Sequence, residues 1–108
     1  MLDWSKIAGF DWDGGNARKS VDKHGVAQTE AEQAFFNVPV LVLEDRAHSE
    51  TERRLHALGQ TNEGRKLHVT FTLRRMDTAI RVISSRDVNA KERLVYDQVP
   101  QTPPALRR

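Results

Sequence analysis

Residues 65–74, Arg-Lys-Leu-His-Val-Thr-Phe-Thr-Leu-Arg, decide the fold that the rest of the chain must fit. Apolar and polar side chains alternate along this stretch, which is the period of a β-strand with one buried face. The apolar members are Leu67, Val69, Phe71 and Leu73, and the polar members are His68, Thr70, Thr72 and Arg74. The stretch therefore predicts a strand with one face on the core and one face open.

Three other segments predict strands of the same sheet. Residues 53–60 lead into a turn at residues 61–64, and residues 80–85, rich in β-branched side chains, follow a turn at Met76-Asp77. Residues 38–44 form another run of β-branched and leucine residues. Short links make consecutive strands antiparallel neighbours. We therefore expect a four-stranded antiparallel meander sheet.

Two helices are expected before the first strand. Residues 16–24 predict a short helix with Asn16 as its N-cap and Gly25 as its C-terminal stop. Thr29 and Glu32 have the spacing of a capping box, which predicts the start of a second helix.

A C-terminal helix is expected over residues 90–98, where Asn89 precedes a glutamate at the third helical position. The elements together predict an α+β domain, with two N-terminal helices, the meander sheet and a C-terminal helix. We expect one domain over residues 1–98 and a proline-rich flexible tail over residues 99–108.

Composition excludes several classes of function. The 108 residues include no cysteine, which excludes disulfides, thiolate catalysis and cysteine-ligated zinc. No apolar run approaches the length of a membrane span, and the N-terminus has no signal-peptide pattern. Residues 53–93 carry ten Lys and Arg against four Asp and Glu, although the net charge of the chain is only +2. This block is either a phosphate-facing surface or an ordinary solvated face.

Arginine and histidine side chains should gather on the open face of the sheet. If the turn at residues 61–64 pairs residues whose numbers sum to 124, Arg54 faces Thr70 and His56 faces His68. The next strand then adds either Arg81 and Ser85 or Ser84 and Arg86, depending on its register. Guanidinium groups converging in this way would bind phosphate, and the alternative is that they only solvate the sheet.

Histidine also raises the possibility of a metal site. A cross-strand pair of His56 and His68 would supply two ligands, with His24 and His48 elsewhere in the chain. The sequence has no H-x-x-x-H pattern and no cysteine to complete such a site. We therefore expect neither a metal nor another cofactor.

The sequence resembles the BrnT-type toxins of bacterial toxin–antitoxin systems over about residues 10–97. The combination of Lys-His-Gly-Val at 23–26, a Phe-Phe pair in the following helix, and Arg-Val-Ile-Ser-Ser-Arg at 81–86 before Glu-Arg is specific as a set. Further matching positions are Trp12, Asp13, Asn16, Glu30, Ala31, His48, Ser49, Glu50, Glu52, Arg54, Leu58, Gly59, Gly64, Arg65, Leu67, His68, Val69, Lys91 and Tyr96.

This resemblance implies a RelE-like ribonuclease fold and a toxin that inhibits translation and growth. It also implies a BrnA-type antitoxin with a ribbon-helix-helix domain, bound in an oligomeric complex that represses its own operon. The toxin would then contact operator DNA only through the antitoxin, in the cytoplasm. Fold likeness by itself is an analogy, so the site still has to be argued from its residues.

Without a metal, RNA is cut most simply when its 2′-hydroxyl attacks the adjacent phosphate. The enzyme must take the 2′ proton, neutralise the phosphorane and protonate the 5′ oxygen. Arginines suit the second task because they stay charged, and a histidine titrates in the range the others need. The candidate catalytic residues are Arg74, Arg86, Arg54, Lys23, Glu30 and His68. The candidate substrate-binding residues are Arg81, Arg65 and Ser85.

Two other classes remain open at the level of sequence. One is a non-catalytic module whose basic sheet binds nucleic acid or an antitoxin-like partner without cutting. The other is a small metal-dependent hydrolase, which would lose its activity in a chelator.

Overall fold

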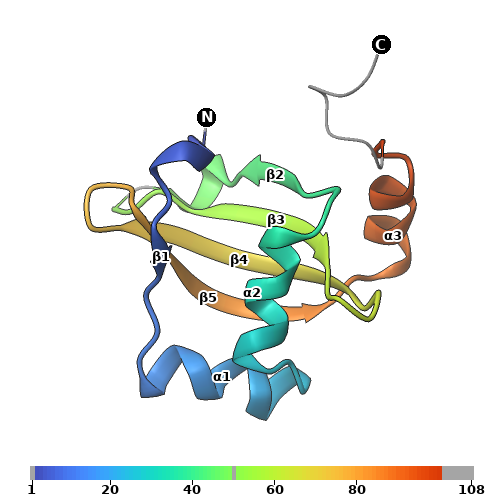
Figure 1. Cartoon of the computed structure of the whole chain (residues 1–108), viewed down its shortest axis with the longest axis horizontal. Coiled ribbons are helices and arrows are strands. Elements are labelled where there is room, and N and C mark those ends of the chain that lie inside the picture. Colours follow the sequence, from blue (N-terminus) through green and yellow to red (C-terminus); the bar gives the residue numbers. More distant parts are fainter. Residues whose placement is uncertain (1, 50, 101–108) are drawn as a thin grey trace.

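A five-stranded sheet in the order β1-β5-β4-β3-β2 forms the centre of the computed structural model, which describes residues 2–49 and 51–100 (Figure 1). The expected α+β class is confirmed. The strands are β1 (Gly9–Phe10), β2 (Leu41–Glu44), β3 (Leu55–Gln60), β4 (Lys66–Arg74) and β5 (Ala79–Asp87). Two single turns of 3-10 helix, Trp4–Lys6 and Arg46–His48, complete the irregular parts.

The prediction of a purely antiparallel four-stranded sheet is wrong, because β1 adds a fifth strand parallel to β5. The Ala8 amide donates to the Thr78 carbonyl at 2.7 Å, and the Asp11 amide donates to the Ile80 carbonyl at 2.8 Å. A two-residue strand has too few positions to show any alternation. Contacts of the N-terminal residues with the core set the pairing of β1. The alternation of apolar and polar residues in the sequence does not reveal such contacts.

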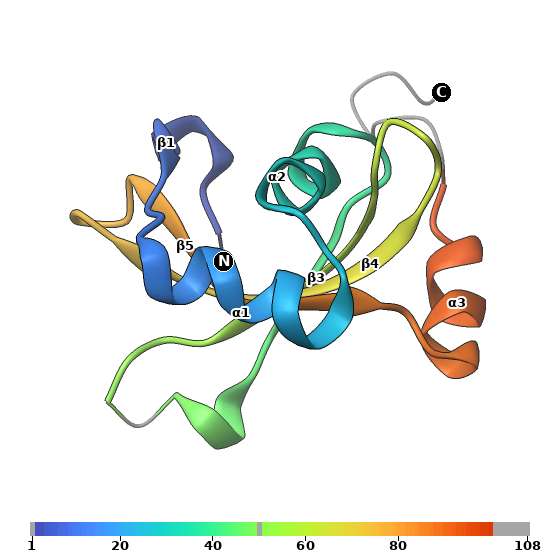
Figure 2. The ribbon, with the colours of Figure 1, turned by 90° about the horizontal axis from the view of Figure 1, so that it is seen from below.

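Helices α1 (Gly14–His24) and α2 (Gln28–Phe36) lie together against the sheet, and α3 (Ala90–Asp97) lies apart from them at its end (Figures 1 and 2). Within the described residues, no helix is long and apolar enough to cross a membrane. Residues 101–108 of the expected tail lie outside the described residues. The domain boundary at residue 98 stays a prediction.

Two of the expected helix starts are displaced. Asp13, rather than Asn16, is the N-cap of α1; its carboxylate accepts from the amides of Gly15 and Asn16. In α2 the Glu30 carboxylate, rather than a Thr29 cap, accepts from the Ala27 amide at 3.0 Å. The stop at Gly25 is confirmed, since its φ of 64° is the left-handed conformation that glycine adopts easily.

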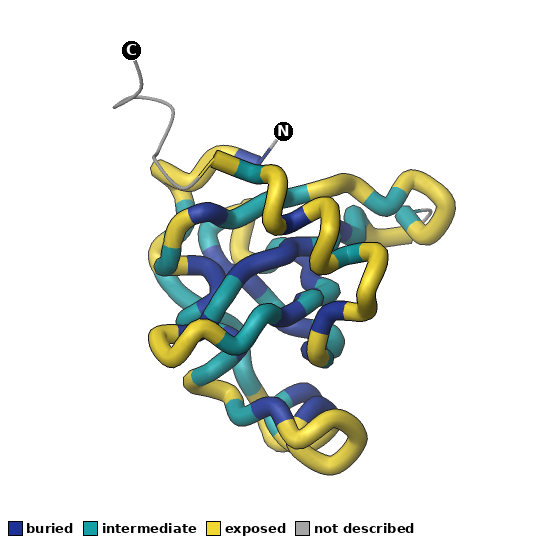
Figure 3. The backbone as a smooth tube through the Cα atoms, turned by 90° about the vertical axis from the view of Figure 1, so that its right-hand side faces the viewer, coloured by how far each residue is buried: buried dark blue, intermediate teal, exposed yellow. Residues whose placement is uncertain are grey.

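The main core lies between the sheet and α1 and α2. Figure 3 shows this buried interior beneath exposed loops. Gly59 lets α2 approach β3 closely, because a Cβ at that position would overlap the Ala34 carbonyl oxygen. The buried residues of this core are Leu2, Val26, Ala31, Ala34, Phe35, Leu55, Ala57, Leu67, Val69, Phe71, Ile80 and Val82.

Of the elements that the structure describes, α3 covers one end of the opposite face of the sheet. There Tyr96 of α3 packs with Leu58 and Val88, and its hydroxyl donates to the Pro39 carbonyl at 2.7 Å. Leu58 reaches this second cluster because it alternates with Ala57 and Gly59, which face α2. The side chains beyond α3 on this face form an open surface, which we call the open face.

The predicted register of β3 and β4 is wrong by two residues. His56 pairs with Thr70 and Leu58 pairs with His68, so that paired numbers sum to 126. The cause is a longer turn, in which the Thr61 amide donates to the Arg65 carbonyl. A shift of two leaves each side chain on its predicted face, so His56 and His68 still share the open face.

A bulge in β5 settles the second open register. Ser84 and Ser85 pair with Thr70 and Val69, whereas Arg81 and Val82 pair with Thr72 and Phe71, which leaves Ile83 as the extra residue. Arg81 and Arg86 therefore both lie opposite polar residues of β4. Ser85, predicted on the polar face in one of the two registers, is fully buried instead, and its amide donates to the Ser20 hydroxyl at 2.8 Å.

Candidate functional site

Two histidines meet on the open face. His56 of β3 and His68 of β4 lie with ring centroids 4.9 Å apart and nearly perpendicular rings. The His68 Nε2 atom is 2.9 Å from His56 Nδ1, and His56 Nδ1 is also 3.0 Å from the Thr70 hydroxyl. The sheet fixes this pair, because diagonal neighbours on one face of an antiparallel ladder lie within side-chain reach.

Each histidine also contacts a carboxylate with its other ring nitrogen. His56 Nε2 lies 2.9 Å from Oδ2 of Asp45, which follows β2, and His68 Nδ1 lies 2.6 Å from Oε2 of Glu92 in α3. Glu92 is held in place as a capping residue, because its carboxylate accepts from the Asn89 amide at 3.0 Å. The result is a continuous chain of four side chains, Asp45–His56–His68–Glu92, which we call the histidine chain.

The hydrogen bonds limit where protons lie in the histidine chain. Hydrogen bonding to His56 lowers the pKa of Asp45 to about 2, and hydrogen bonding to Arg86 lowers the pKa of Glu92 to about 2, so both carboxylates are ionised at neutral pH. An ionised carboxylate only accepts hydrogen bonds, so Asp45 accepts from His56 Nε2. The contact between His56 Nδ1 and His68 Nε2 needs a proton on one of these two nitrogens, and His68 Nδ1 faces both Glu92 and the Arg86 guanidinium.

Arg86 of β5 adds a second positive charge beside His68. Its Nη1 and Nη2 atoms donate to the two Glu92 carboxylate oxygens at 2.8 and 2.9 Å, a bidentate pair. This pairing raises the pKa of Arg86, whereas burial lowers the pKa of His68 against the opposing effect of Glu92. A partly buried imidazole whose pKa is lowered gives up a bound proton readily, which suits an acid–base group.

A pocket lies at each end of the histidine chain. A polar pocket of about 370 Å³ is lined by Arg54, His48, Ala47 and Thr51, and His48 Nδ1 contacts Asp45 at 2.9 Å. The other pocket, of about 270 Å³, opens between β2 and α3, with both histidines and Glu92 among its lining residues. An anion and a mostly apolar group could thus be held on either side of the same acid–base pair.

Two pairs of the residues expected from the sequence are brought into direct contact. Nη2 of Arg86 lies 3.0 Å from Nδ1 of His68, and Arg65 forms a separate ion pair with Glu30 at 3.1 Å. Arg54 lies near the Asp45 end of the histidine chain, in the polar pocket. Arg74 lies where β4 ends and forms an ion pair with Glu52.

The other predicted residues are held elsewhere. Arg81 pairs with Asp13 at 2.9 Å and with Asp11 at 3.4 Å, at the N-terminal edge of the sheet. Arg65 bonds to Asp87, to Glu30 and to the carbonyls ending α1, which fastens the β3–β4 turn to the helices. Glu30 and the exposed Lys23 belong to the helix layer and lie across the sheet from His68.

Sequence reasoning missed the two carboxylates of the histidine chain. Asp45 follows the strand expected over residues 38–44 and has no pattern of its own, and Glu92 was recognised only as a capping residue. His56 was considered as a metal ligand and not as an acid or base. The capping pattern at Asn89 was a usable signal for Glu92, because it places that side chain at the first turn of α3, beside the end of β5.

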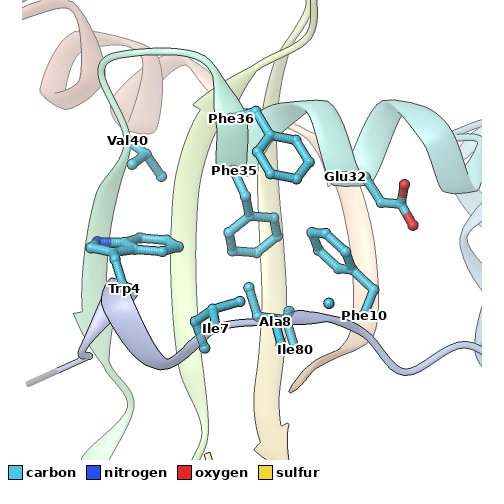
Figure 4. A pocket seen from close by; sticks show the side chains of 10 residues that line it. Trp4, Ile7, Ala8, Phe10, Glu32, Phe35, Phe36, Val40 and Ile80 are labelled. Carbon is cyan, nitrogen blue, oxygen red and sulfur yellow. The ribbon is translucent and has the colours of Figure 1, made fainter. Parts of the chain in front are cut away.

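No group of three or more potential metal ligands comes together within residues 2–49 and 51–100. A larger pocket of about 520 Å³ lies on the helix side of the sheet, between the N-terminal segment and α2 (Figure 4). Trp4, Ile7, Phe10, Phe35 and Phe36 surround it, and Glu32 is its one ionisable lining residue. The described residues that line it include neither a cation nor an acid–base pair, so the histidine chain is the stronger candidate for chemistry.

Comparisons with known proteins agree with the sequence resemblance. Residues 12–92 match the family described as the ribonuclease toxin BrnT of type II toxin–antitoxin systems. The 1.1 Å crystal structure of the Brucella abortus ribonuclease toxin BrnT has a similar fold, with a TM-score of 0.59. It is 24% identical in sequence, and the match covers 77% of this chain and 99% of that one. No curated protein sequence matches the chain.

Proposed function

The chain belongs to the BrnT family of ribonuclease toxins from type II toxin–antitoxin systems, and from this premise we propose that it cleaves RNA at the histidine chain without a metal ion. The observation that carries the proposal is the hydrogen-bonded pair of His56 and His68 on the open face, with Arg86 beside it. RNA cleavage by the 2′-hydroxyl needs a proton acceptor, a proton donor and a cation, and this cluster offers all three.

The proton inventory of the pair balances the reaction. The 2′ oxygen forms a bond to phosphorus while the bond from phosphorus to the 5′ oxygen breaks. One imidazole takes the 2′ proton, and a proton of the pair goes to the 5′ oxygen. The pair begins and ends with the same number of protons, and the products carry a 2′,3′-cyclic phosphate and a 5′-hydroxyl. RNA is required, because DNA lacks the attacking group.

Arginines would neutralise the charge that develops on the phosphate. Arg86 is next to His68, and Arg54 lines the polar pocket at the other end of the histidine chain. Arg74 is proposed to contact the RNA backbone further along the sheet. Arg65 and Arg81 are engaged in internal ion pairs, and we assign them the role of holding the turn and the sheet edge.

The partner we propose is a BrnA-type antitoxin with a ribbon-helix-helix domain. Membership of a type II family supports an antitoxin that neutralises the toxin as a protein. We further propose that the two proteins act in the cytoplasm as an oligomeric complex, and that operator DNA is contacted through the antitoxin.

A second candidate function is a non-catalytic binding module. One observation favours it: the histidine chain is satisfied internally, with each ring nitrogen facing a partner, so it could simply fasten α3 and the segment after β2 to the sheet. In that case the basic open face would bind nucleic acid or a partner without cutting.

An RNA-cleavage assay in excess EDTA separates these functions. We expect cleavage to persist, with cyclic phosphate at the 3′ ends and hydroxyl at the 5′ ends. His68→Gln should reduce the rate by about 10²–10⁴-fold, the contribution of a general acid or base. The matched control is His24→Gln, an exposed histidine at the end of α1 that should leave the rate unchanged. Stable protein that binds RNA without cutting it would favour the binding module.

A further inference from the structure

Exposed aliphatic side chains flank the opening of the 270 Å³ pocket beside the histidine chain. Leu43 of β2 is 53% exposed and Val95 of α3 is 45% exposed, and both line the pocket. Leu58, which is buried, lines it as well. Large apolar side chains that face a concave surface next to a polar cluster are typical of a ligand site.

The polar lining residues of this pocket are arranged around the aliphatic ones. Asn89 and Lys91 of the start of α3 contribute amide and ammonium groups, and His56 and His68 lie at the sheet end. A volume of about 270 Å³ is below the usual range for a drug-sized ligand, about 300–1,000 Å³, and suits a single ring system. A nucleobase has this form: two flat apolar faces and an edge of hydrogen-bond donors and acceptors.

Charge favours RNA over an acidic or apolar protein segment as the occupant. Lys91 lines the pocket, the Glu92 carboxylate that also lines it is neutralised by Arg86, and Arg54 lines the polar pocket at the other end of the histidine chain. Cations on both sides of an apolar slot match a chain of bases with a phosphate on each side, since single-stranded RNA is held through base faces and backbone charge together.

We propose that the pocket lined by Leu43, Leu58 and Val95 is a subsite for one unpaired nucleobase adjoining the bond that is cut. The inference rests on the proposed ribonuclease function and adds what that function lacks, a feature that fixes the position of the RNA relative to His56 and His68. A base held between Leu43 and Val95 would orient its own ribose toward the histidine chain. Paired bases would not fit, so cleavage should be restricted to single-stranded RNA.

Titration of the isotope-labelled full-length protein with the four nucleoside 3′-monophosphates tests the subsite directly. We expect shifts in the methyl signals of Leu43, Leu58 and Val95 and in the imidazole signals of His56 and His68. Ribose 5-phosphate and inorganic phosphate lack a base and should leave the three methyl signals in place. Equal methyl shifts with these probes, or shifts confined to surface lysines and arginines, would overturn the proposal.

Paired variants on α3 make the test quantitative. Val95→Ala should weaken binding of the 3′-monophosphates and raise KM for single-stranded RNA by about fivefold, with kcat nearly unchanged, because it removes apolar contact with the base. Leu94→Ala is the matched control, because Leu94 is exposed on the same helix and does not line the pocket. Equal effects of the two substitutions would contradict the subsite.

The two proposals fail in different ways. If the protein cuts no RNA but the 3′-monophosphates still shift the pocket methyl groups, the ribonuclease function is wrong and the base subsite stands. If RNA is cut and the pocket signals do not move, the subsite is wrong and the catalytic proposal stands. If added antitoxin shifts the pocket methyl groups and the nucleotides do not, the occupant is a protein side chain, and the proposal is overturned.

Discussion

Glu92 joins the structure of α3 to the chemistry of the open face. One carboxylate accepts from the Asn89 amide, from both Nη atoms of Arg86, and from His68. Loss of its charge would disturb the helix cap and also remove the carboxylate that faces His68 Nδ1. A substitution at Glu92 should therefore change both the stability of the fold and the acid–base pair.

We predict that Glu92→Gln reduces stability and flattens its dependence on pH. The folded-state pKa values of Glu92 and Asp45 are lowered to about 2, from usual values of 4.5 and 3.8. A lowered carboxylate pKa stabilises the fold fully above about pH 4.5, and this stability is lost as pH falls toward 2. Denaturant unfolding from pH 7 to pH 2 should show this decline in the unsubstituted protein.

At pH 7 we expect Glu92→Gln to cost about 1–3 kcal/mol, the range for hydrogen bonds to a charged group. The variant should also lose less stability than the unsubstituted protein between pH 4.5 and pH 2. Glu63→Gln, in the exposed turn between β3 and β4, is the control and should behave as the unsubstituted protein. Parallel pH curves for Glu92→Gln and its parent would show that folding does not lower the pKa of the Glu92 carboxylate.

At the scale of the elements, the sequence reveals strands through their periodic side chains. It does not reveal features, such as bulges, that depend on contacts between distant residues. The alternation in residues 65–74 correctly predicts β4 and its two faces, because burial of one face imposes a period of two. The same alternation cannot show a bulge, so the relation of Arg81 to Arg86 became clear only from the pairing of β5.

The candidate site was predictable in part for the same reason. His68 and His56 follow from strand alternation, which survives a register error of two residues. Asp45 lies outside any regular element, and its approach to His56 depends on how the chain turns after β2. Lys23 and Glu30 were named through the family resemblance, and the sheet separates their helices from the histidine chain.

The close packing of α2 on β3 leads to a prediction about stability. Gly59→Ala should cost about 3 kcal/mol, because the added Cβ overlaps the backbone oxygen of Ala34, which can move only if α2 moves. Gly9→Ala is the control, since a Cβ at Gly9 has no atom within 4 Å and the residue lies in strand β1. Chemical denaturation of both variants checks this. Equal stabilities would mean that α2 is not tightly packed on the sheet.

At the scale of the whole molecule, the two sides of the sheet differ in what they hold. The helix side holds the main core, and the opposite side holds the histidine chain with α3 covering one end. The N-terminal segment lies on the helix side, where Trp4 meets Phe35 edge-on at 6.1 Å and Phe10 meets Phe35 at 5.7 Å. This segment precedes residue 12, where the match to the family begins.

The N-terminal segment and the histidine chain lie on opposite sides of the sheet. We therefore predict that deletion of residues 2–8 lowers the stability of the fold and leaves RNA cleavage intact. Deletion exposes Phe35 and removes the buried Leu2 and the partly buried Ile7, which should cost roughly 3 kcal/mol. For a domain of this size that lowers the melting temperature by roughly 10–20 °C. Cleavage measured well below the new melting temperature should match the full chain, because the histidine chain lies across the sheet.

Deletion of residues 2–8 is decisive when its melting temperature and its cleavage rate are measured on the same preparation. A lower melting temperature with an unchanged rate at low temperature places the N-terminal segment in the scaffold alone. A large loss of rate in a variant that is still folded would mean that the helix side reaches the chemistry. Lys23 and Glu30 would then regain the catalytic roles that the family resemblance implied, and the histidine chain could no longer account for cleavage by itself.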